Sequence, residues 1–245
     1  LMTILFGILW GIGGLTFGLS MRYLGVALGQ SIALGTCAGL GTIMGPVLLH
    51  LFFPEQNPLA QLTTAVLIGV AVTLIGIAII GAAGAMKAKQ VNGDTNTDFN
   101  FPKGITIALL AGFMSGCFNV GLTFGADIHF EQSAPIFATL PATLLVTMGG
   151  FVTNLIYCLY QNHKNKTFSD YKSGWKSNLL WCCLAGLLWY SQFFGLALGK
   201  GFIPSDSTLY VVAFCVLMAL NVIFSNVWGI ILKEWNGCNK KTIVV

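Results

Sequence analysis

Residues 5–25 read LFGILWGIGGLTFGLSMRYLG, an apolar stretch that is rich in glycine, contains one tryptophan and carries one arginine near its end. A related stretch, LAGLLWYSQFFGLALG, spans residues 184–199. Both contain glycine, an aliphatic residue, leucine and tryptophan in that order, ending at Trp10 and at Trp189. The predictions for the fold and the function of the rest of the chain start from these two stretches.

Charged residues are scarce and clustered along the chain. Only 8% of the residues are charged, against about 25% in a typical soluble domain. About 20 apolar residues in a helix cross a hydrocarbon core of about 30 Å, and membrane barrel strands would instead alternate polar and apolar residues. The sequence therefore predicts an all-α polytopic membrane protein with seven transmembrane helices. The windows without Asp, Glu, Lys or Arg are 1–21, 23–54, 56–86, 104–126, 132–163, 177–199 and 207–232.

The basic residues predict the orientation of these helices, because Lys and Arg accumulate in short cytoplasmic loops. Of the 12 basic residues, all but Lys200 follow the first, third, fifth or seventh window. That side is therefore predicted to be cytoplasmic, and the first helix runs inward. The net charge of +4 belongs to this bias and does not indicate a nucleic-acid partner.

Glycines four residues apart recur in several windows, for example Gly7 with Gly11, Gly41 with Gly45 and Gly195 with Gly199. This spacing lets helix backbones approach closely in lipid and predicts a tightly packed bundle. The most polar loop, residues 84–103, divides the chain into an N-terminal part, 1–83, with three helices and a C-terminal part, 104–245, with four. The seven cysteines form no CxxC pair, so no metal site is expected.

The two related stretches run in opposite directions, because five membrane crossings separate the first helix from the sixth. Repeats of opposite orientation are typical of secondary transporters, which hold substrate near the midplane between the halves. Trp10 and Trp189 each lie about halfway along their helices, so both are expected near the bilayer centre. The alternatives are that both are large packing residues, or that the short match arose by chance.

Four segments carry a resemblance to a known family: WGIGGLTFGLSMRYLG (10–25), LPATLLVTMGGFVTNLIYCLY (140–160), GLLWYSQFF (186–194) and KEWN (233–236). Together they resemble the bacterial L-rhamnose–proton symporters of the drug/metabolite transporter superfamily. The resemblance implies an inverted-repeat bundle of five plus five helices, of which this chain covers helices three to nine and lacks the last. It also implies import of L-rhamnose with protons by alternating access across the bacterial inner membrane, driven by the proton gradient and without a cofactor.

A neutral sugar requires neutral hydrogen-bonding groups and an aromatic surface. On the sixth helix Trp189, Gln192 and Phe193 share one face, and Tyr190 lies on a neighbouring face. Among these Gln192 is the leading candidate for a substrate-binding residue. The other candidates are Trp10, Asn119 and Asn221, although a lone amide in a membrane helix more often binds a neighbouring helix.

Proton coupling needs a group that titrates, and no carboxylate lies inside any of the seven windows. The candidates are therefore Asp127, His129 and Glu131, close together in the loop before the fifth helix, which a solvated loop would equally explain. Glu234 lies at the inner edge of the seventh helix, where Lys233 can pair with it.

The sequence bears on three alternative functions. The same fold could transport another sugar or small metabolite, because fold does not determine substrate. A membrane-embedded enzyme would need ionisable residues clustered at membrane depth, and the common catalytic motifs are absent. A channel would need a ring of charge or a filter-like segment, and neither is present.

Overall fold

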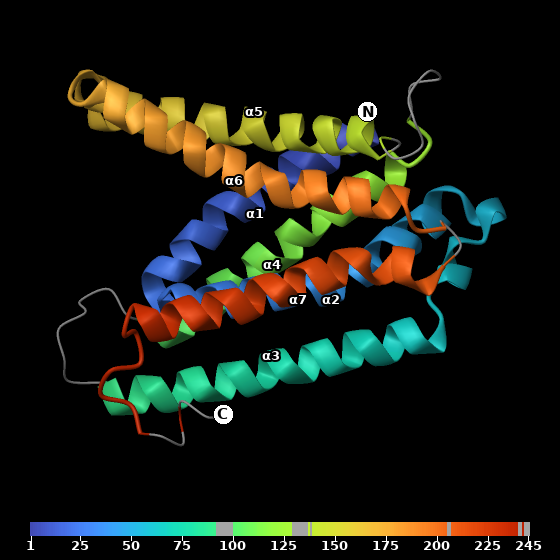
Figure 1. The fold of residues 1–245 in the computed structure, drawn as a ribbon, viewed down its shortest axis with the longest axis horizontal. Coiled ribbons are helices and arrows are strands. Elements are labelled where there is room, and N and C mark those ends of the chain that lie inside the picture. The colour runs from blue at the N-terminus through green and yellow to red at the C-terminus, as the bar shows by residue number, and fades with distance from the viewer. Residues whose placement is uncertain (92–99, 129–136, 138, 205–206, 240–241, 243–245) are drawn as a thin grey trace.

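The computed structural model describes residues 1–91, 100–128, 137, 139–204, 207–239 and 242. Within these ranges the chain forms a bundle of seven long helices joined by short connections (Figure 1). All seven are long and apolar enough to cross a membrane, which confirms the predicted fold class. The helices are α1 (Met2–Leu24), α2 (Val26–Phe52), α3 (Thr64–Val91), α4 (Phe101–Phe124), α5 (Leu140–Asn165), α6 (Trp175–Gly201) and α7 (Thr208–Ile231), with short 3-10 turns at Pro54–Gln56, Pro58–Gln61 and Thr167–Lys172.

The predicted linker 84–103 is largely helical at its beginning. Helix α3 continues to Val91, because the residues after Gly84 are mostly good helix formers such as alanine, methionine, lysine and glutamine. Helix α4 begins at Phe101, where the side chain of Asn100 caps it by accepting a hydrogen bond from the backbone N–H of Lys103 at 3.1 Å.

The C-terminal ends of α1, α3, α5 and α7 lie at one end of the bundle (Figure 1). We call this the basic end, because eleven of the chain's twelve basic residues lie near the C-terminal ends of these four helices or in the sequence that follows them. Lys103 Nζ, for example, donates to the hydroxyl of Tyr23 at 2.8 Å across the start of α4 and the end of α1. The alternation of helix directions is therefore as the sequence predicts, and α1 and α6 are antiparallel (Figure 1).

Close backbone contacts hold α1, α2, α4 and α5 together. A Cβ atom added at Gly7 of α1 would meet the backbone oxygen of Val146 in α5. A Cβ atom added at Gly41 of α2 would lie 3.3 Å from the Cα of Gly116 in α4. The prediction of glycine-mediated packing is therefore confirmed for pairs such as Gly7 with Gly11 and Gly41 with Gly45, whereas Gly14 and Gly18 of α1 have no neighbour within 4 Å among the described residues. Helix α4 packs against both α1 and α2, so helices from the two predicted parts, 1–83 and 104–245, share one core.

The same prediction is wrong for α6. A Cβ atom added at Gly186, Gly195 or Gly199 would have no neighbour within 4 Å among the described residues. Only Phe193 and Ala197 of α6 are buried. The glycines of this helix face open space, because α6 contacts the bundle through a narrow strip of its surface.

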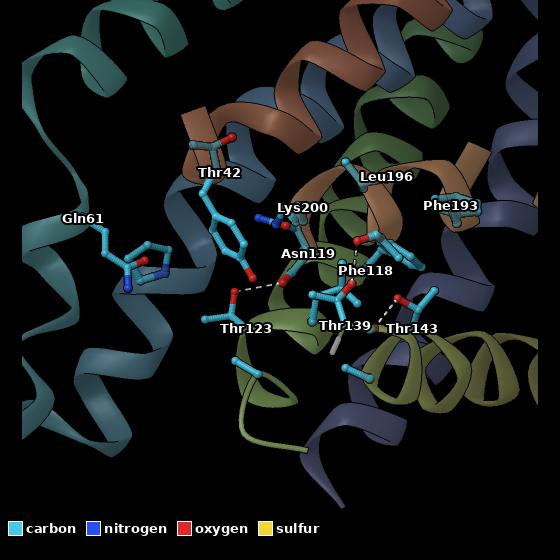
Figure 2. Close-up of a pocket in the computed structure, with 16 residues that line it drawn as sticks. Thr42, Gln61, Phe118, Asn119, Thr123, Thr139, Thr143, Phe193, Leu196 and Lys200 are labelled. Carbon is cyan, nitrogen blue, oxygen red and sulfur yellow. Dashed lines mark hydrogen bonds between the residues drawn. The ribbon is translucent and has the colours of Figure 1, made fainter. Parts of the chain in front are cut away.

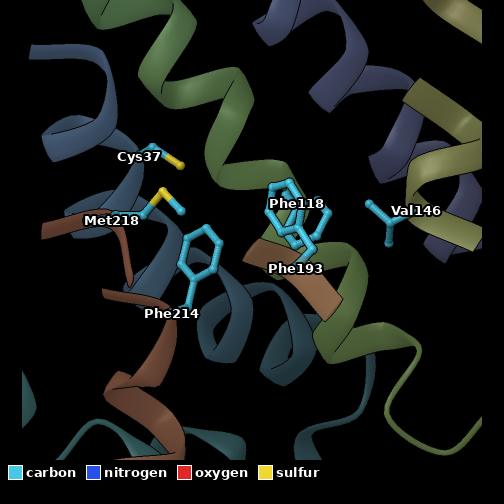
Figure 3. Packing of buried hydrophobic residues seen from close by; sticks show 7 residues of the cluster. Cys37, Phe118, Val146, Phe193, Phe214 and Met218 are labelled. Carbon is cyan, nitrogen blue, oxygen red and sulfur yellow. The ribbon is translucent and has the colours of Figure 1, made fainter. Parts of the chain in front are cut away.

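A cluster of buried residues packs between α2, α4, α5, α6 and α7. Figure 3 shows its aromatic and sulfur-containing side chains turned toward one another. The cluster comprises Cys37, Ala38, Phe118, Val146, Phe193, Phe214 and Met218. Phe118 and Phe193 have ring centroids only 4.6 Å apart, so they join α4 to α6 at the centre of this core.

Candidate functional site

A cavity with a volume of about 490 Å³ lies between six of the seven helices. We call it the central cavity. This volume falls within the range of about 300–1,000 Å³ that is common for small-molecule sites. The lining side chains come from α1, α2, α4, α5, α6 and α7, and none of the described ones is charged. Five of them are polar: Gln30, Ser115, Asn154, Gln192 and Asn221.

One wall of the central cavity is aromatic and joins the two related stretches of sequence. The rings of Trp10 and Trp189 are stacked, with centroids 5.8 Å apart and an interplanar angle of 19°. Phe193 packs edge-on against Trp189 at 5.0 Å, and Phe118 lies 5.1 Å from Trp10. The two tryptophans, on antiparallel helices, therefore form one continuous surface.

A pair of amides stands beside this aromatic wall. Asn221 Nδ2 donates to Gln192 Oε1 at 3.0 Å and also to the backbone oxygen of Leu217 at 3.0 Å. The NH₂ group of Gln192 has no acceptor among the described residues, so it can donate to a ligand in the cavity. The structure thus brings together Trp10, Trp189, Gln192, Phe193 and Asn221 from the sequence-based candidates.

Two other candidates lie elsewhere. Tyr190 is half-buried on α6 and lines neither this cavity nor the second one described below. Asn119 donates to the backbone oxygen of Gly41 at 2.9 Å and so links α4 to α2. Asn226 similarly donates to Ser31 Oγ at 2.8 Å. Asn119 and Asn226 therefore each bridge two helices, as a lone amide in a membrane helix commonly does.

Sequence reasoning overlooked Gln30 and Ser115 as lining residues. Gln30 carries the only side-chain amide in the window 23–54, and this isolation was a usable signal. Ser115 had no such signal, because a serine in a membrane helix commonly binds its own backbone. Its place on the cavity wall depends on the rotation of α4 within the bundle.

Figure 2 shows a second cavity, of about 140 Å³. It lies toward the end of the bundle opposite the basic end, because Thr139 just before α5 and Lys200 near the end of α6 line it. Threonine hydroxyls, Asn119 and Gln61 contribute to its lining. Lys200 also lines it, with Nζ 4.5 Å from the centroid of the Tyr210 ring. Phe118 and Phe193 line both cavities, so this aromatic pair separates the second cavity from the central one.

The candidates for proton coupling are only partly described. Asp127 is exposed in the turn that follows α4, at the same end of the bundle as Lys200. His129 and Glu131 lie outside the described residues. In the described part of the chain, no three His, Cys, Asp or Glu side chains come together as metal ligands would.

Comparison with known proteins gives consistent results along the whole chain. The model of a family described as L-rhamnose-proton symport protein matches residues 1–245. The L-rhamnose-proton symporter of Enterobacter sp. (strain 638) is 34% identical over 251 residues, covering 98% of this chain and 72% of that protein. The L-rhamnose-proton symporter of Yersinia pestis (strain Pestoides F) is 36% identical over 256 residues, with the same coverage. No match was found among solved structures.

Proposed function

The chain belongs to the L-rhamnose–proton symporter family, and from this premise we propose that it carries L-rhamnose with protons through its central cavity. The observation that supports this site best is the wall formed by Trp10 and Trp189, which stand on antiparallel helices beside the amides of Gln192 and Asn221. The same cavity therefore contacts both of the related stretches that a rocking motion would move against each other.

The chemistry of the cavity suits a neutral deoxy sugar. The face of a sugar ring is lined by C–H groups and packs on aromatic surfaces, for which the stacked tryptophans provide an area. Sugar hydroxyls both donate and accept, and the amides of Gln30, Asn154 and Gln192 can do both in return. The methyl group of a 6-deoxy sugar would fit against the apolar side chains of Phe214 and Met218.

The absence of charge from the described lining also fits this substrate. A buried charged group without a partner costs far more than an amide, and a neutral sugar would provide no counter-ion. The cavity can therefore bind and release a sugar without leaving an ion unpaired. An anionic or cationic metabolite would not find its complement among these side chains.

We further propose that the driving ion is the proton, that Asp127, His129 and Glu131 take part in proton uptake, and that no cofactor is used. Asp127 is exposed at the end opposite the basic end, which is the external side by the distribution of lysine and arginine. In a bacterium this arrangement corresponds to the inner membrane. A transporter also leaves its substrate chemically unchanged, so we propose no catalytic residues.

Uptake of labelled L-rhamnose tests this function directly. The full-length protein would be reconstituted into vesicles, and uptake would be measured with an imposed proton gradient, without one, and with a protonophore. We expect accumulation above the external concentration only when the gradient is present. Uptake that is indifferent to the gradient, or absent for L-rhamnose while another metabolite is accumulated, would contradict the proposal.

A further inference from the structure

Glu234, in the KEWN segment just after α7, is bound to the beginning of α2. Its Oε1 accepts a hydrogen bond from the backbone N–H of Val26 at 2.9 Å, and its Oε2 accepts one from Ala27 at 3.0 Å. The first N–H groups of a helix have no partner within the helix, and the positive end of the helix dipole favours a carboxylate there. Both oxygens of one side chain therefore tie the end of α7 to the start of α2. The sequence-based pairing of Glu234 with Lys233 did not anticipate this contact.

The backbone around these two hydrogen bonds packs closely against the Glu234 carboxylate. Gly25, which precedes α2, has a φ of 85°, a conformation that side chains other than glycine rarely adopt. A Cβ atom added there would also lie 3.0 Å from Glu234 Oε2. On the other side, a Cβ atom added at Gly229 of α7 would meet the Cβ of Ala27. The helices α2 and α7 are thus in direct contact at the basic end.

The segment after α7 also binds α3. Lys87 Nζ lies 4.9 Å from the centroid of the ring of Trp235, the residue that follows Glu234. Gln90 Nε2 donates to Thr242 Oγ1 at 2.8 Å, and Gln90 Oε1 accepts from the backbone N–H of Asn239 at 2.7 Å. Glu234 is therefore the negative group in a set of polar contacts that covers the basic end between α2, α3 and α7.

The hydrogen bonds of Glu234 lie next to the central cavity. Gln30 lines the cavity four residues beyond Val26 on α2, a distance of about 6 Å along a helix. Phe214, Met218 and Asn221 of α7 line the same cavity. If α2 and α7 separate at the basic end to open the cavity to the cytoplasm, the two hydrogen bonds of Glu234 must break. We propose that Glu234 is a positioning residue that holds the cytoplasmic end of the cavity closed between substrate-release events. This inference rests on the proposed transport function.

Cytoplasmic access to the cavity can be measured without transport. In the full-length protein, Cys37 on the cavity wall would be kept and the other cysteines replaced by serine. Labelling of Cys37 by a membrane-impermeant maleimide would then be followed in inside-out vesicles. Glutamine at position 234 loses the charge and one acceptor oxygen, so we expect Glu234→Gln to raise the labelling rate about fivefold. Glu234→Asp, which keeps the charge on a shorter side chain, should lie between the two.

Asp170→Asn is the matched control, because Asp170 is an exposed carboxylate on the same side that binds no helix amide among the described residues. It should label at the native rate. Equal labelling of the native protein and Glu234→Gln would overturn the proposal, as would an equal rise in Asp170→Asn. Because labelling does not require sugar uptake, this result stands apart from the outcome of the L-rhamnose experiment.

A second experiment compares one double variant before and after crosslinking, so that the loss of the Glu234 carboxylate is common to both measurements. Cysteines placed by Val26→Cys and Glu234→Cys would be joined with a short reducible crosslinker after the protein has inserted. We expect uptake to stop in the crosslinked protein and to return on reduction, because α2 and α7 could no longer separate. Uptake at the uncrosslinked rate would show that the two helix ends need not move apart, and the proposal would be wrong.

Discussion

Replacing Gln192 by alanine is the most direct perturbation of the proposed sugar site. The side chain is half-buried, lines the central cavity beside Trp189 and accepts a hydrogen bond from Asn221 at 3.0 Å. Its NH₂ group has no acceptor in the described structure and is therefore free to donate to a sugar hydroxyl. Glutamine to alanine removes both the donor and the acceptor without introducing a charge.

The expected magnitude follows from these contacts. A neutral hydrogen bond contributes about 0.5–1.5 kcal/mol, and 1.4 kcal/mol corresponds to a tenfold change in affinity. Loss of one or two bonds to the sugar should therefore raise KM for L-rhamnose about tenfold. Insertion should remain normal, because Asn221 keeps its hydrogen bond to the backbone oxygen of Leu217 at 3.0 Å.

The assay is initial uptake of labelled L-rhamnose as a function of concentration, normalised to the amount of inserted protein. Ser191→Ala is the matched control, because Ser191 is the adjacent residue, is exposed and, among the described residues, binds only the backbone oxygen of Leu188 in its own helix. It should leave KM unchanged. Combining Gln192→Ala with Asn221→Ala should cost less than the sum of the two single changes, since the side chains are bonded to each other. An unchanged KM in Gln192→Ala would refute the assignment of this residue to the site.

Two further predictions concern the aromatic wall and the proton. Gly150→Ala would place a methyl group 2.5 Å from ring carbons of Trp10, whereas Gly195→Ala would meet nothing within 4 Å, so only the former should displace the ring. We expect a cost of about 1–3 kcal/mol in stability and a shift in tryptophan fluorescence with reduced uptake for Gly150→Ala, and native behaviour for Gly195→Ala. The double variant Asp127→Asn, Glu131→Gln should lose gradient-driven accumulation but retain exchange of labelled for unlabelled sugar. A native pH profile of uptake in that variant would exclude both carboxylates from the proton pathway.

Several features of the site could be recognised in the sequence because they depend on local spacing. Trp189, Gln192 and Phe193 share a face at i, i+3 and i+4, and this relation holds in any α-helix. The match between the stretches ending at Trp10 and Trp189 indicated which other helix would contribute. Glu234 could not be assigned in this way, because its partners at Val26 and Ala27 are backbone groups more than 200 residues earlier in the chain.

The glycine pattern illustrates the same limit. The sequence presents Gly41, Gly116 and Gly195 as equivalent small residues in apolar helices. In the structure Gly41 and Gly116 meet across α2 and α4, whereas Gly195 faces open space. Spacing shows that a helix can approach another closely, but it does not show which of its faces has a neighbour.

The sequence alone was sufficient for the number of helices that are long and apolar enough to cross a membrane, for their alternating directions and for the neutral character of the proposed sugar-binding face. The physical reason is that hydrocarbon excludes unpaired backbone groups and charges, so long uncharged windows must become helices and charges must collect at their ends. Only the tertiary structure decided that Trp10 stacks on Trp189, that Asn119 joins α2 instead of lining the central cavity, and that Glu234 ties α7 to α2. These contacts depend on the rotation and depth of each helix relative to its neighbours, which are set by the packing of many side chains together.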